Sequence, residues 1–333
     1  MLNNILILAA LSCTAAMADI FGPLSDHFIS HLNKRPKRND ALLRQISAFG
    51  ETGSFGGKVF SEEKLGNTPI VFIHGNSDSA LKFGDGPFQS GWDEILKYFM
   101  SKDYTLAELY GITYGDRNIS NSYIRHFNCQ NVQLHRRFLE FVLHYTKAKQ
   151  INIVAHSMGV SIARKAIQGG EFVTKTESCD IGPNLSHRIG TFIALASANY
   201  GMCPCQHAFA FPACGMETGF FPGTCPEMTC SSQDVNISET CGEVPYSNYL
   251  MNLNNSGKKD ASFVASLWSD DDEILGKGNM VWGRQTSLVP HSDMRKIYSD
   301  LKHNDVKLLT AEDQYNIIHM NDQKFSLHET TEY

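Results

Sequence analysis

Short apolar runs alternate with amphipathic stretches from about residue 69 to the end of the chain. Unbroken apolar runs are typical of strands buried on both faces of a parallel sheet, and here they cover 69–73, 106–112, 151–155, 191–196 and 263–268. A weaker strand is predicted at 297–298. Apolar residues at helical spacing predict helices over 91–100, 134–145, 158–167 and 311–318. Strands separated by helices predict an α/β fold, a mostly parallel sheet flanked by helices and joined by right-handed crossovers.

The interval 200–258 breaks this rhythm and is rich in Cys, Gly, Pro and Phe. We expect it to be a disulfide-rich insertion. Its apolar stretches 208–212 and 220–222 make it a candidate lipid-facing lid, or alternatively a loop that packs on the body of the domain.

The number of cysteines left to form disulfides depends on whether the first segment is removed. Of nine cysteines, Cys13 lies in the first segment, and the other eight are Cys129, Cys179, Cys203, Cys205, Cys214, Cys225, Cys230 and Cys241. An even number in an exported chain predicts disulfides, four if all of them pair, although the connectivity cannot be read from the sequence. No zinc-type spacing with histidines is present.

The N-terminus has the pattern of a secretory signal peptide. A short apolar run over 5–11 is followed by Ala16-Met17-Ala18, which fits a cleavage site. The sequence therefore predicts a signal peptide over 1–18, a single hydrolase domain over 19–333, and a secreted, extracellular protein. No later apolar run is long enough to span a bilayer. Sequons at Asn118, Asn184, Asn236 and Asn254 are candidate glycan sites.

Composition excludes several other classes of protein. The chain has 333 residues, 42% of them hydrophobic, and a net charge of −6 without a long basic run. This is ordinary globular composition, and it argues against a nucleic-acid partner. No motif calls for a cofactor, and no dedicated metal motif is visible.

The central chemical signal is Ala155-His156-Ser157-Met158-Gly159. An apolar strand precedes this pentapeptide and an amphipathic helix follows it. That context is typical of the nucleophile elbow, a sharp strand-to-helix turn that lifts a serine hydroxyl above the sheet. The sequence therefore predicts Ser157 as a nucleophile.

An acyl-transfer site also needs an oxyanion hole, formed by backbone N–H groups. One donor is expected just after the nucleophile and the other after the first apolar strand. These positions fall on Met158 and Asn76, both acting through the main chain. For His74, before Asn76, we favour a structural role in orienting the loop.

The base and its orienting carboxylate should follow later strands, in the order Ser, acid, His. The acidic run after residue 268 offers Asp272, with Asp270 as the alternative. His303 follows the weak strand and precedes the last helix, which is where this arrangement delivers its base. The remaining downstream histidines, His291, His319 and His328, are the less favoured alternatives.

At these residues the chain resembles the secreted class 2 lipases, the EstA/EstB lipase family, in a branch expanded in nematodes. The resemblance runs from about residue 20 to 318, and the matching stretches are 53–58 (GSFGGK), 70–78 (IVFIHGNSD), 108–111 (ELYG), 156–160 (HSMGV), 163–167 (ARKAI), 198–201 (ANYG) and 281–286 (VWGRQT). It implies an α/β-hydrolase fold. It also implies that Asp272-Glu273-Ile274 carries the acid and that His303 is the base.

Together these observations predict a serine hydrolase that cleaves carboxylic esters of lipids through an acyl-enzyme, in the manner of a triacylglycerol lipase. The expected partner is a lipid ester, which such an enzyme can meet at a lipid–water interface. Two alternatives stay open at this stage. One is a short-chain carboxylesterase, phospholipase or thioesterase, and the other is a non-catalytic secreted lipid-binding protein.

Overall fold

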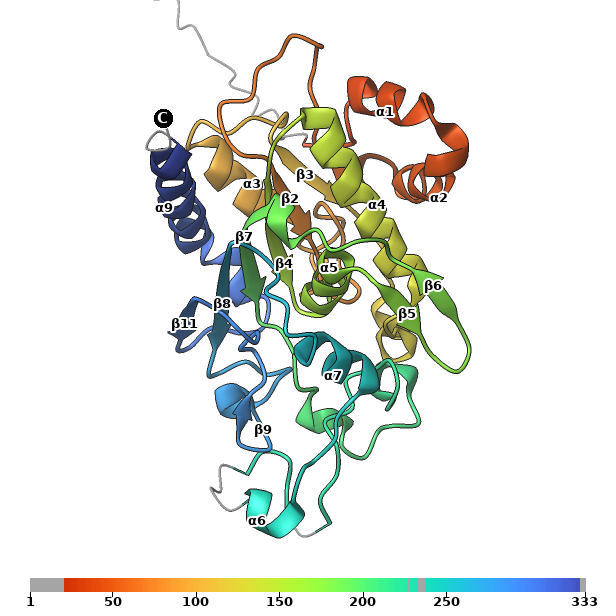
Figure 1. Cartoon of the computed structure of the whole chain (residues 1–333), viewed down its shortest axis with the longest axis vertical. Coiled ribbons are helices and arrows are strands. Elements are labelled where there is room, and N and C mark those ends of the chain that lie inside the picture. The colour runs from red at the N-terminus through yellow and green to blue at the C-terminus, as the bar shows by residue number, and fades with distance from the viewer. Residues whose placement is uncertain (1–20, 227, 233–236, 330–333) are drawn as a thin grey trace, which may run out of the picture.

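Within the described residues, seven strands form one sheet around which the domain is built (Figure 1). The computed structural model describes residues 21–226, 228–232 and 237–329, with side chains up to 323 except at positions 38, 238 and 277. The predicted signal peptide, Cys13 and the Asn236 sequon lie outside these ranges. The strand order is β1-β3-β2-β4-β7-β8-β11. Only β1 (Ser54–Phe55) runs antiparallel to its neighbour, so the predicted mostly parallel sheet is confirmed.

The central strands are the apolar runs of the sequence. They are β2 (Ile70–Ile73), β3 (Leu109–Ile112), β4 (Ile151–His156), β7 (Ile189–Leu195) and β8 (Phe263–Ser269). Nearly every residue in them is buried, as expected for strands covered on both faces. The weak strand predicted at 297–298 is β11 (Met294–Tyr298), whose residues alternate between half-buried and exposed because it forms the edge of the sheet.

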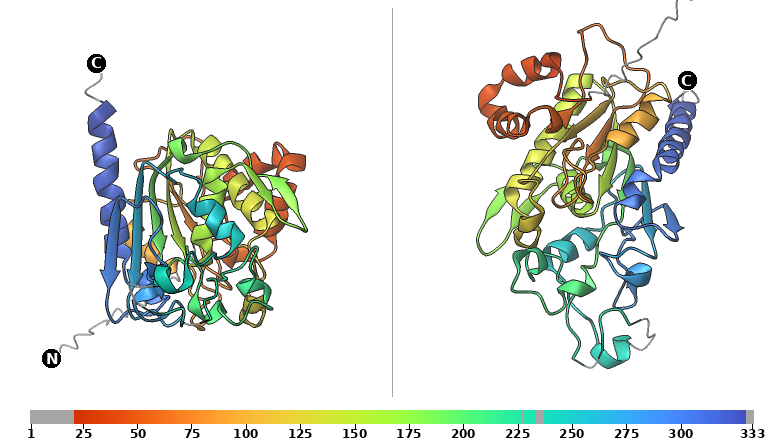
Figure 2. Two further views of the ribbon diagram at one scale, coloured as in Figure 1. Left: turned by 60° about the horizontal axis from the view of Figure 1, so that its bottom comes forward. Right: turned by 180° about the vertical axis from the view of Figure 1, so that it is seen from behind.

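Helices cover both faces of the sheet (Figure 2). On one face α4 (Cys129–Thr146) packs against α5 (Met158–Gln168), with α1 (Asp26–Asn33) and α2 (Pro36–Ser47) against α4. On the other, α3 (Asp93–Met100) packs against α9 (Ala311–Glu329). The sequence patterns did not predict α1 and α2. Because parallel strands point the same way, the segments that follow β2, β4, β8 and β11 meet at one edge of the sheet.

The insertion over 200–258 leaves β7 at that edge and forms the lower part of the molecule in Figure 1. It holds two short 3₁₀ helices, Cys203–Cys205 and Pro212–Cys214, and the helices α6 (Ile237–Cys241) and α7 (Asn248–Asn254). Three disulfides brace it, Cys203–Cys230, Cys205–Cys214 and Cys225–Cys241.

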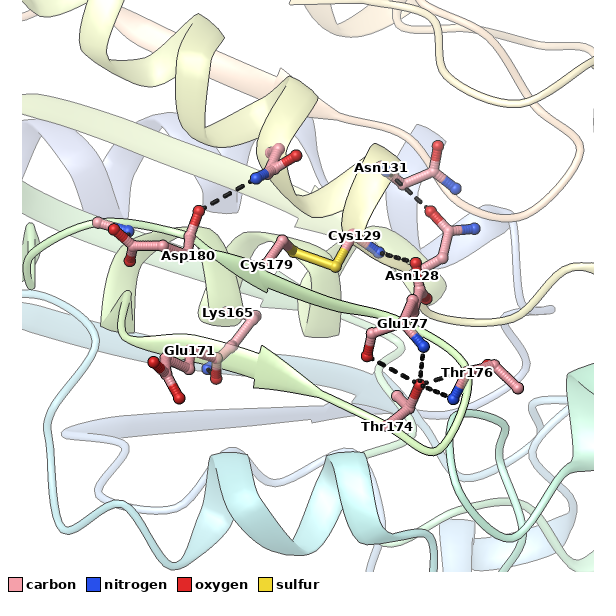
Figure 3. Close-up of a disulfide and its surroundings, with 12 residues drawn as sticks. Asn128, Cys129, Asn131, Lys165, Glu171, Thr174, Thr176, Glu177, Cys179 and Asp180 are labelled. Carbon is pink, nitrogen blue, oxygen red and sulfur yellow. Dashed lines mark hydrogen bonds between the residues drawn. A yellow bond between two sulfur atoms is a disulfide. The ribbon is translucent and has the colours of Figure 1, made fainter.

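A fourth disulfide lies outside the insertion (Figure 3). Cys129, the first residue of α4, is bonded to Cys179 in β6 (Ser178–Asp180), which pairs with β5 (Glu171–Val173). The side chain of Asn128 caps α4 by accepting from the N–H of Asn131 at 2.9 Å. Glu177 accepts from the N–H of Cys129 at 3.2 Å, so the hairpin and the start of α4 form one unit. All eight cysteines outside the first segment are therefore paired, as expected.

Candidate active site

Ser157 occupies a sharp turn between β4 and α5. Its backbone has φ 53° and ψ −126°, a conformation that costs a residue with a side chain about 1–3 kcal/mol and is common at functional sites. The turn is held because the Ser157 N–H donates to the carbonyl of Leu195 on the neighbouring strand, at 2.8 Å. This is the elbow geometry that the pentapeptide predicts.

Two glycines allow the close approach that this turn requires. A Cβ added to Gly159 would lie 2.3 Å from the carbonyl oxygen of His74 and 2.8 Å from that of Ile73. A Cβ added to Gly75 would lie 2.9 Å from the Cβ of Ser157. The start of α5 therefore packs directly on the end of β2, which puts Ser157 beside the loop that follows β2.

Asp272 and His303 are brought together at the same edge of the sheet. His303 Nδ1 lies 2.7 Å from Asp272 Oδ2, and both side chains are almost completely buried. The second carboxylate oxygen of Asp272 accepts from the N–H groups of Ile274 and Leu275, at 2.9 and 2.8 Å. These bonds fix the carboxylate, which in turn holds the imidazole with Nδ1 toward it and Nε2 free to face a substrate.

The alternative residues lie elsewhere. Asp270 is joined through its backbone N–H to the carbonyl of Tyr298, and Asp272, not Asp270, is hydrogen-bonded to His303. His291 and His319 are exposed, and His319 stacks on Tyr315 in α9. The side chain of His328 lies outside the described residues.

The backbone of His303 is held from two further directions. Its N–H donates to Glu273 Oε2 at 2.9 Å, and its carbonyl accepts from Nε2 of His156 at 3.1 Å. Because the acceptor is a carbonyl, Nε2 of His156 must carry the proton. The residue before Ser157 is thus bonded to the residue that the sequence predicts as its base.

Asn76 and Met158 flank Ser157. Met158 is the first residue of α5, where a backbone N–H has no acceptor within the helix. The Asn76 side chain is directed to the segment 118–125: its Nδ2 donates to the Ser122 carbonyl at 2.9 Å, and its Oδ1 accepts from Arg125 at 2.7 Å. Arg125 also donates to the hydroxyl of Ser77. Both polar atoms of the Asn76 side chain are therefore engaged with protein groups.

A cavity of about 290 Å³ contains these groups. Asn76, Ser157, Met158 and His303 all line it. Its remaining wall is largely apolar and includes Phe88, Ile119, Tyr123, Met202, Phe220 and Ile274. The insertion contributes Met202, Ala213 and Phe220 to this wall. The site therefore joins a strained serine and a carboxylate-bound imidazole to a pocket suited to an apolar group.

Burial keeps two neighbouring histidines neutral. Desolvation lowers the pKa of His74 to about 3, and desolvation together with the nearby His303 holds the pKa of His156 well below its ordinary value. His74 donates from Nδ1 to the Gly75 carbonyl at 2.7 Å and accepts from the Tyr114 N–H at Nε2, at 3.0 Å. These bonds are consistent with the structural role expected for His74.

Sequence patterns did not single out Glu273, His156 or Arg125 as parts of the site. Glu273 belongs to the acidic run after residue 268, in which only one residue was expected to orient the base. Arg125 directly follows a 3₁₀ helix, Ile119–Ile124, that has no apolar periodicity, and no signal in the sequence could have linked this segment to Asn76. In the described ranges, His, Cys, Asp and Glu side chains nowhere gather in groups of three that could hold a metal ion.

The strand order, the strained turn at Ser157 and the Asp272–His303 pair at one sheet edge define an α/β-hydrolase. The sequence matches the family described as Lipase (class 2) over residues 67–316, and the chain belongs to that family. None of the helices in the described ranges has the length and apolarity that a bilayer-spanning segment needs.

Several solved structures resemble the chain at low sequence identity. Aspergillus fumigatus lipase B is 12% identical, with a TM-score of 0.41, and the match covers 74% of this chain but only 48% of the Aspergillus lipase, about half its length. The Paleococcus ferrophilus monoacylglycerol lipase is 12% identical with a TM-score of 0.43, covering 76% of this chain and 95% of the other. A structure from a study of the metagenome-derived lipolytic enzymes LipS and LipT is 11% identical with a TM-score of 0.46, covering 81% and 98%.

Proposed function

We propose that the chain hydrolyses carboxylic esters of lipids through an acyl-enzyme on Ser157. The observation that carries this proposal is the buried 2.7 Å contact between His303 and Asp272 in a cavity that Ser157 also lines. A carboxylate-oriented imidazole beside a serine at a strained elbow is the arrangement that activates a serine hydroxyl. Membership of the class 2 lipase family supports lipolytic ester hydrolysis as the reaction.

The proposed reaction has two halves. His303 Nε2 takes the Ser157 proton as the serine oxygen attacks the ester carbonyl, and Asp272 stabilises the imidazolium that forms. The N–H groups of Asn76 and Met158 hold the oxyanion. The alcohol leaves with the proton from His303, and water then releases the acid from Ser157 by the same route.

The first test is hydrolysis of p-nitrophenyl butyrate, p-nitrophenyl palmitate and emulsified triolein by the wild type and by Ser157→Ala. Loss of Ser157 should lower kcat by several orders of magnitude, and Asp272→Asn should lower it by about 10⁴-fold. Ser161→Ala is the matched control, because Ser161 is a buried serine of α5, the helix that follows Ser157, and lies outside the cavity wall; this variant should stay active. The chain-length preference separates a lipase from a short-chain esterase.

A folded wild type that hydrolyses none of these esters and does not react with a fluorophosphonate would contradict the enzyme proposal. That outcome would favour the lipid-binding alternative, because a carrier has no activated serine to label. Activity on phospholipids or thioesters alone would keep the mechanism and change the substrate class.

The outer edge of the cavity supports a substrate at a lipid surface. Ile119, Tyr123 and Ile124 of η2 (Ile119–Ile124) and Phe209 and Phe211 of the insertion, here called the rim, are each about half exposed. The rings of Tyr123 and Phe211 meet edge to face with centroids 5.6 Å apart, so the two segments form one patch. Ile119 and Tyr123 also line the cavity. Exposed apolar patches of this kind mark binding surfaces.

We therefore propose that the rim contacts the lipid–water interface. Phe220 and Phe221, which the sequence suggested as part of a lid, are instead buried in the body, and the loop with Phe209 and Phe211 is closed by the Cys205–Cys214 disulfide. This arrangement favours a fixed rim over a lid that moves as a whole.

The rim can be tested with a double variant, Tyr123→Ser with Phe211→Ser. Its activity on emulsified triolein should fall at least tenfold, while its activity on dissolved p-nitrophenyl butyrate should change little. Val173→Ser, which removes an even more exposed apolar side chain from β5, is the control and should change neither. Equal losses on both substrates would contradict docking through the rim, and strong activation above the critical micelle concentration would favour a moving lid.

We also propose that the protein is exported after cleavage behind Ala18. The four disulfides support this, because such bonds persist in oxidising compartments. When the full chain is expressed in secretory cells, the protein should be recovered from the culture medium, and its N-terminal sequence should start at residue 19. Retention in the cytosol with free thiols would contradict export.

A further inference from the structure

An ion pair is buried between the loop after β2 and the segment after His303. Lys307 Nζ lies 2.5 Å from Asp78 Oδ2, and the two side chains are 0% and 2% exposed. The two residues are 229 positions apart in the chain. Lys307 belongs to α8 (Asp305–Leu308), the short helix that begins two residues after His303.

The other contacts of the pair satisfy both charges. The second oxygen of Asp78 accepts from the Gly91 N–H at 3.0 Å. The Lys307 ammonium also donates to the Ser90 hydroxyl at 2.9 Å and lies 5.4 Å from the centre of the Trp92 ring. Burial by itself would raise the pKa of Asp78, but the charge and hydrogen bond of Lys307, together with His74 and the Gly91 N–H, hold that pKa below its ordinary value.

A pair of this kind is a poor device for stability alone. Removing two charges from water is costly, and well-packed apolar side chains of similar size often stabilise a fold as well or better. Its position suggests a different role. Asp78 lies two residues after Asn76, and Lys307 lies four residues after His303, so the pair spans the two segments that flank Ser157.

Apart from this pair, His303 is anchored mainly from the ends of β8 and β4. Asp272 and Glu273 hold it to the end of β8, and His156 holds its carbonyl from the elbow. Toward the loop after β2, the links are the contacts of Lys307 with Asp78 and Ser90 and a bond from the side chain of Asn304 to the carbonyl of Pro87. Of these, only the ion pair reaches the segment that carries Asn76.

We propose that the Asp78–Lys307 pair is a positioning device that sets the separation between the oxyanion donor Asn76 and the base His303. This inference rests on the proposed function of those two residues. Asp78 and Lys307 are positioning residues, because both carboxylate oxygens and the ammonium are engaged with protein groups. Asp78 also lines the cavity, and Lys307 neutralises a carboxylate that would otherwise oppose a developing oxyanion there.

The test is a neutral double variant, Asp78→Asn with Lys307→Met, which keeps side-chain size and leaves no buried charge without its partner. We expect a folded protein with a melting temperature within a few degrees of the wild type. Its kcat on p-nitrophenyl butyrate should fall at least tenfold with KM within twofold, and its rate of fluorophosphonate labelling should fall by the same factor. A purely structural pair would not produce this division between kcat and KM.

The matched control is Lys296→Met with Asp313→Asn. That pair, at 2.6 Å, joins β11 to α9, the two elements that precede and follow the segment with His303, and neither residue lines the cavity. Its loss should leave kcat unchanged. If the first double variant does not fold, Asp78→Glu, which keeps both charges of the pair but lengthens one partner by a methylene group, should still lower kcat with KM unchanged.

The outcomes separate this inference from the proposed function. A wild type that neither hydrolyses esters nor reacts with a fluorophosphonate defeats both. An active wild type together with a folded double variant of wild-type kcat overturns the positioning role alone, as would a folded Asp78→Glu variant of unchanged kcat.

Discussion

His156 Nε2 donates to the backbone carbonyl of His303 across 3.1 Å, and the two imidazole rings lie 4.8 Å apart. The residue before the proposed nucleophile is therefore bonded to the proposed base. Since β4 carries His156 in a fully buried position, the bond connects the rigid centre of the sheet to a segment that comes 147 residues later.

Substitutions of His156 should show whether its hydrogen bond positions His303 or whether its ring only fills space in the core. His156→Phe keeps a ring but leaves the His303 carbonyl without its donor, which should cost about 1–3 kcal/mol of unfolding free energy. It should also lower kcat on p-nitrophenyl butyrate by roughly tenfold, because about 1.4 kcal/mol of lost transition-state stabilisation is a factor of ten.

His156→Gln is the matched control, because its amide nitrogen can take the place of Nε2. It should recover most of the lost activity. Equal activity in the Phe variant and the wild type would show that the bond does not position His303.

The close contact at the elbow gives a second prediction. In Gly159→Ala the new methyl group would meet the His74 carbonyl at 2.3 Å, and the start of α5 must move to relieve it. We expect a loss of about 1–3 kcal/mol in unfolding free energy, with a large fall in kcat.

Gly66→Ala is the comparison, since its nearest neighbour is a side-chain oxygen at 3.6 Å. Urea unfolding should show that this variant is within about 0.5 kcal/mol of the wild type. A Gly159→Ala variant as stable and active as Gly66→Ala would contradict the account of the elbow.

The elbow could be predicted because its parts are local. A buried strand, a serine between small residues and a helix follow one another within about 15 positions, and each leaves its own pattern. The places of Asp272 and His303 follow from topology, because parallel strands deliver their ends to one edge. β11 left only a weak pattern because, as the edge strand, it exposes Arg295 and Ile297 to solvent.

The parts of the site that could not be predicted depend on contacts between distant segments. Lys307 and Asp78 are ordinary charged residues in the sequence, and only the fold buries them against each other. The same holds for Arg125 and Asn76, which are 49 positions apart. The apolar residues of η2 form part of the rim only because the insertion brings Phe211 beside Tyr123, and neither segment has a period that reports this.

Loss of the longest-range disulfide and loss of the shortest-range one should have different effects on stability and activity. Cys129–Cys179 has a sequence separation of 50 and Cys205–Cys214 one of 9. In the chain-entropy treatment, their loss costs about 4 and about 3 kcal/mol. Replacing the first pair by Ala should therefore lower the guanidinium midpoint more but leave kcat unchanged, since β6 lies away from the cavity.

Replacing Cys205 and Cys214 by Ala should lower stability less but should change activity. The loop that carries Phe209 and Phe211 would lose its closure, so activity on emulsified triolein should fall more than activity on dissolved butyrate. A loss of dissolved-ester activity in the Cys129–Cys179 variant alone would contradict this division.

Buried neutral histidines should make stability depend on pH. Desolvation lowers the pKa of His135 to about 4 and that of His74 to about 3, below the ordinary value of 6.5. Between those values and 6.5 the unfolded chain binds protons that the folded chain does not, so the unfolding free energy should fall as the pH falls from about 6.5 toward 4. Each such histidine contributes a slope of up to about 1.4 kcal/mol per pH unit.

His135→Phe should reduce this slope. The His135 side chain bonds only to the carbonyl of Asn131 among the described residues, and its Nε2 is buried without a partner there, so a phenyl ring fits its surroundings. Guanidinium unfolding at pH 7, 6 and 5 should show the variant losing less stability than the wild type over that range. Curves for the two proteins that stay parallel would contradict the assignment.

The structure distinguishes between the sequons. Asn118 is exposed, and its side-chain oxygen accepts from the N–H of Ser120. The side-chain nitrogen of Asn254, the atom that would carry a glycan, instead donates to the carbonyl of Asn199 at 2.9 Å and to the Tyr246 hydroxyl at 3.0 Å. Its oxygen accepts from Arg164 at 2.8 Å. A sugar at Asn254 would break this network.

We therefore expect protein secreted from eukaryotic cells to carry a glycan at Asn118 and none at Asn254. Peptide mass spectrometry after enzymatic deglycosylation in heavy-oxygen water marks each site that was occupied. Asn118→Gln should remove one glycan's mass, whereas Asn254→Gln should leave the mass of the glycoprotein unchanged apart from the substitution. Because Asn118 directly precedes Ile119 of the rim, Asn118→Gln should also alter activity on emulsified triolein more than on dissolved butyrate. Occupancy at Asn254 in folded, active protein would show that the Arg164 network is not needed for the fold.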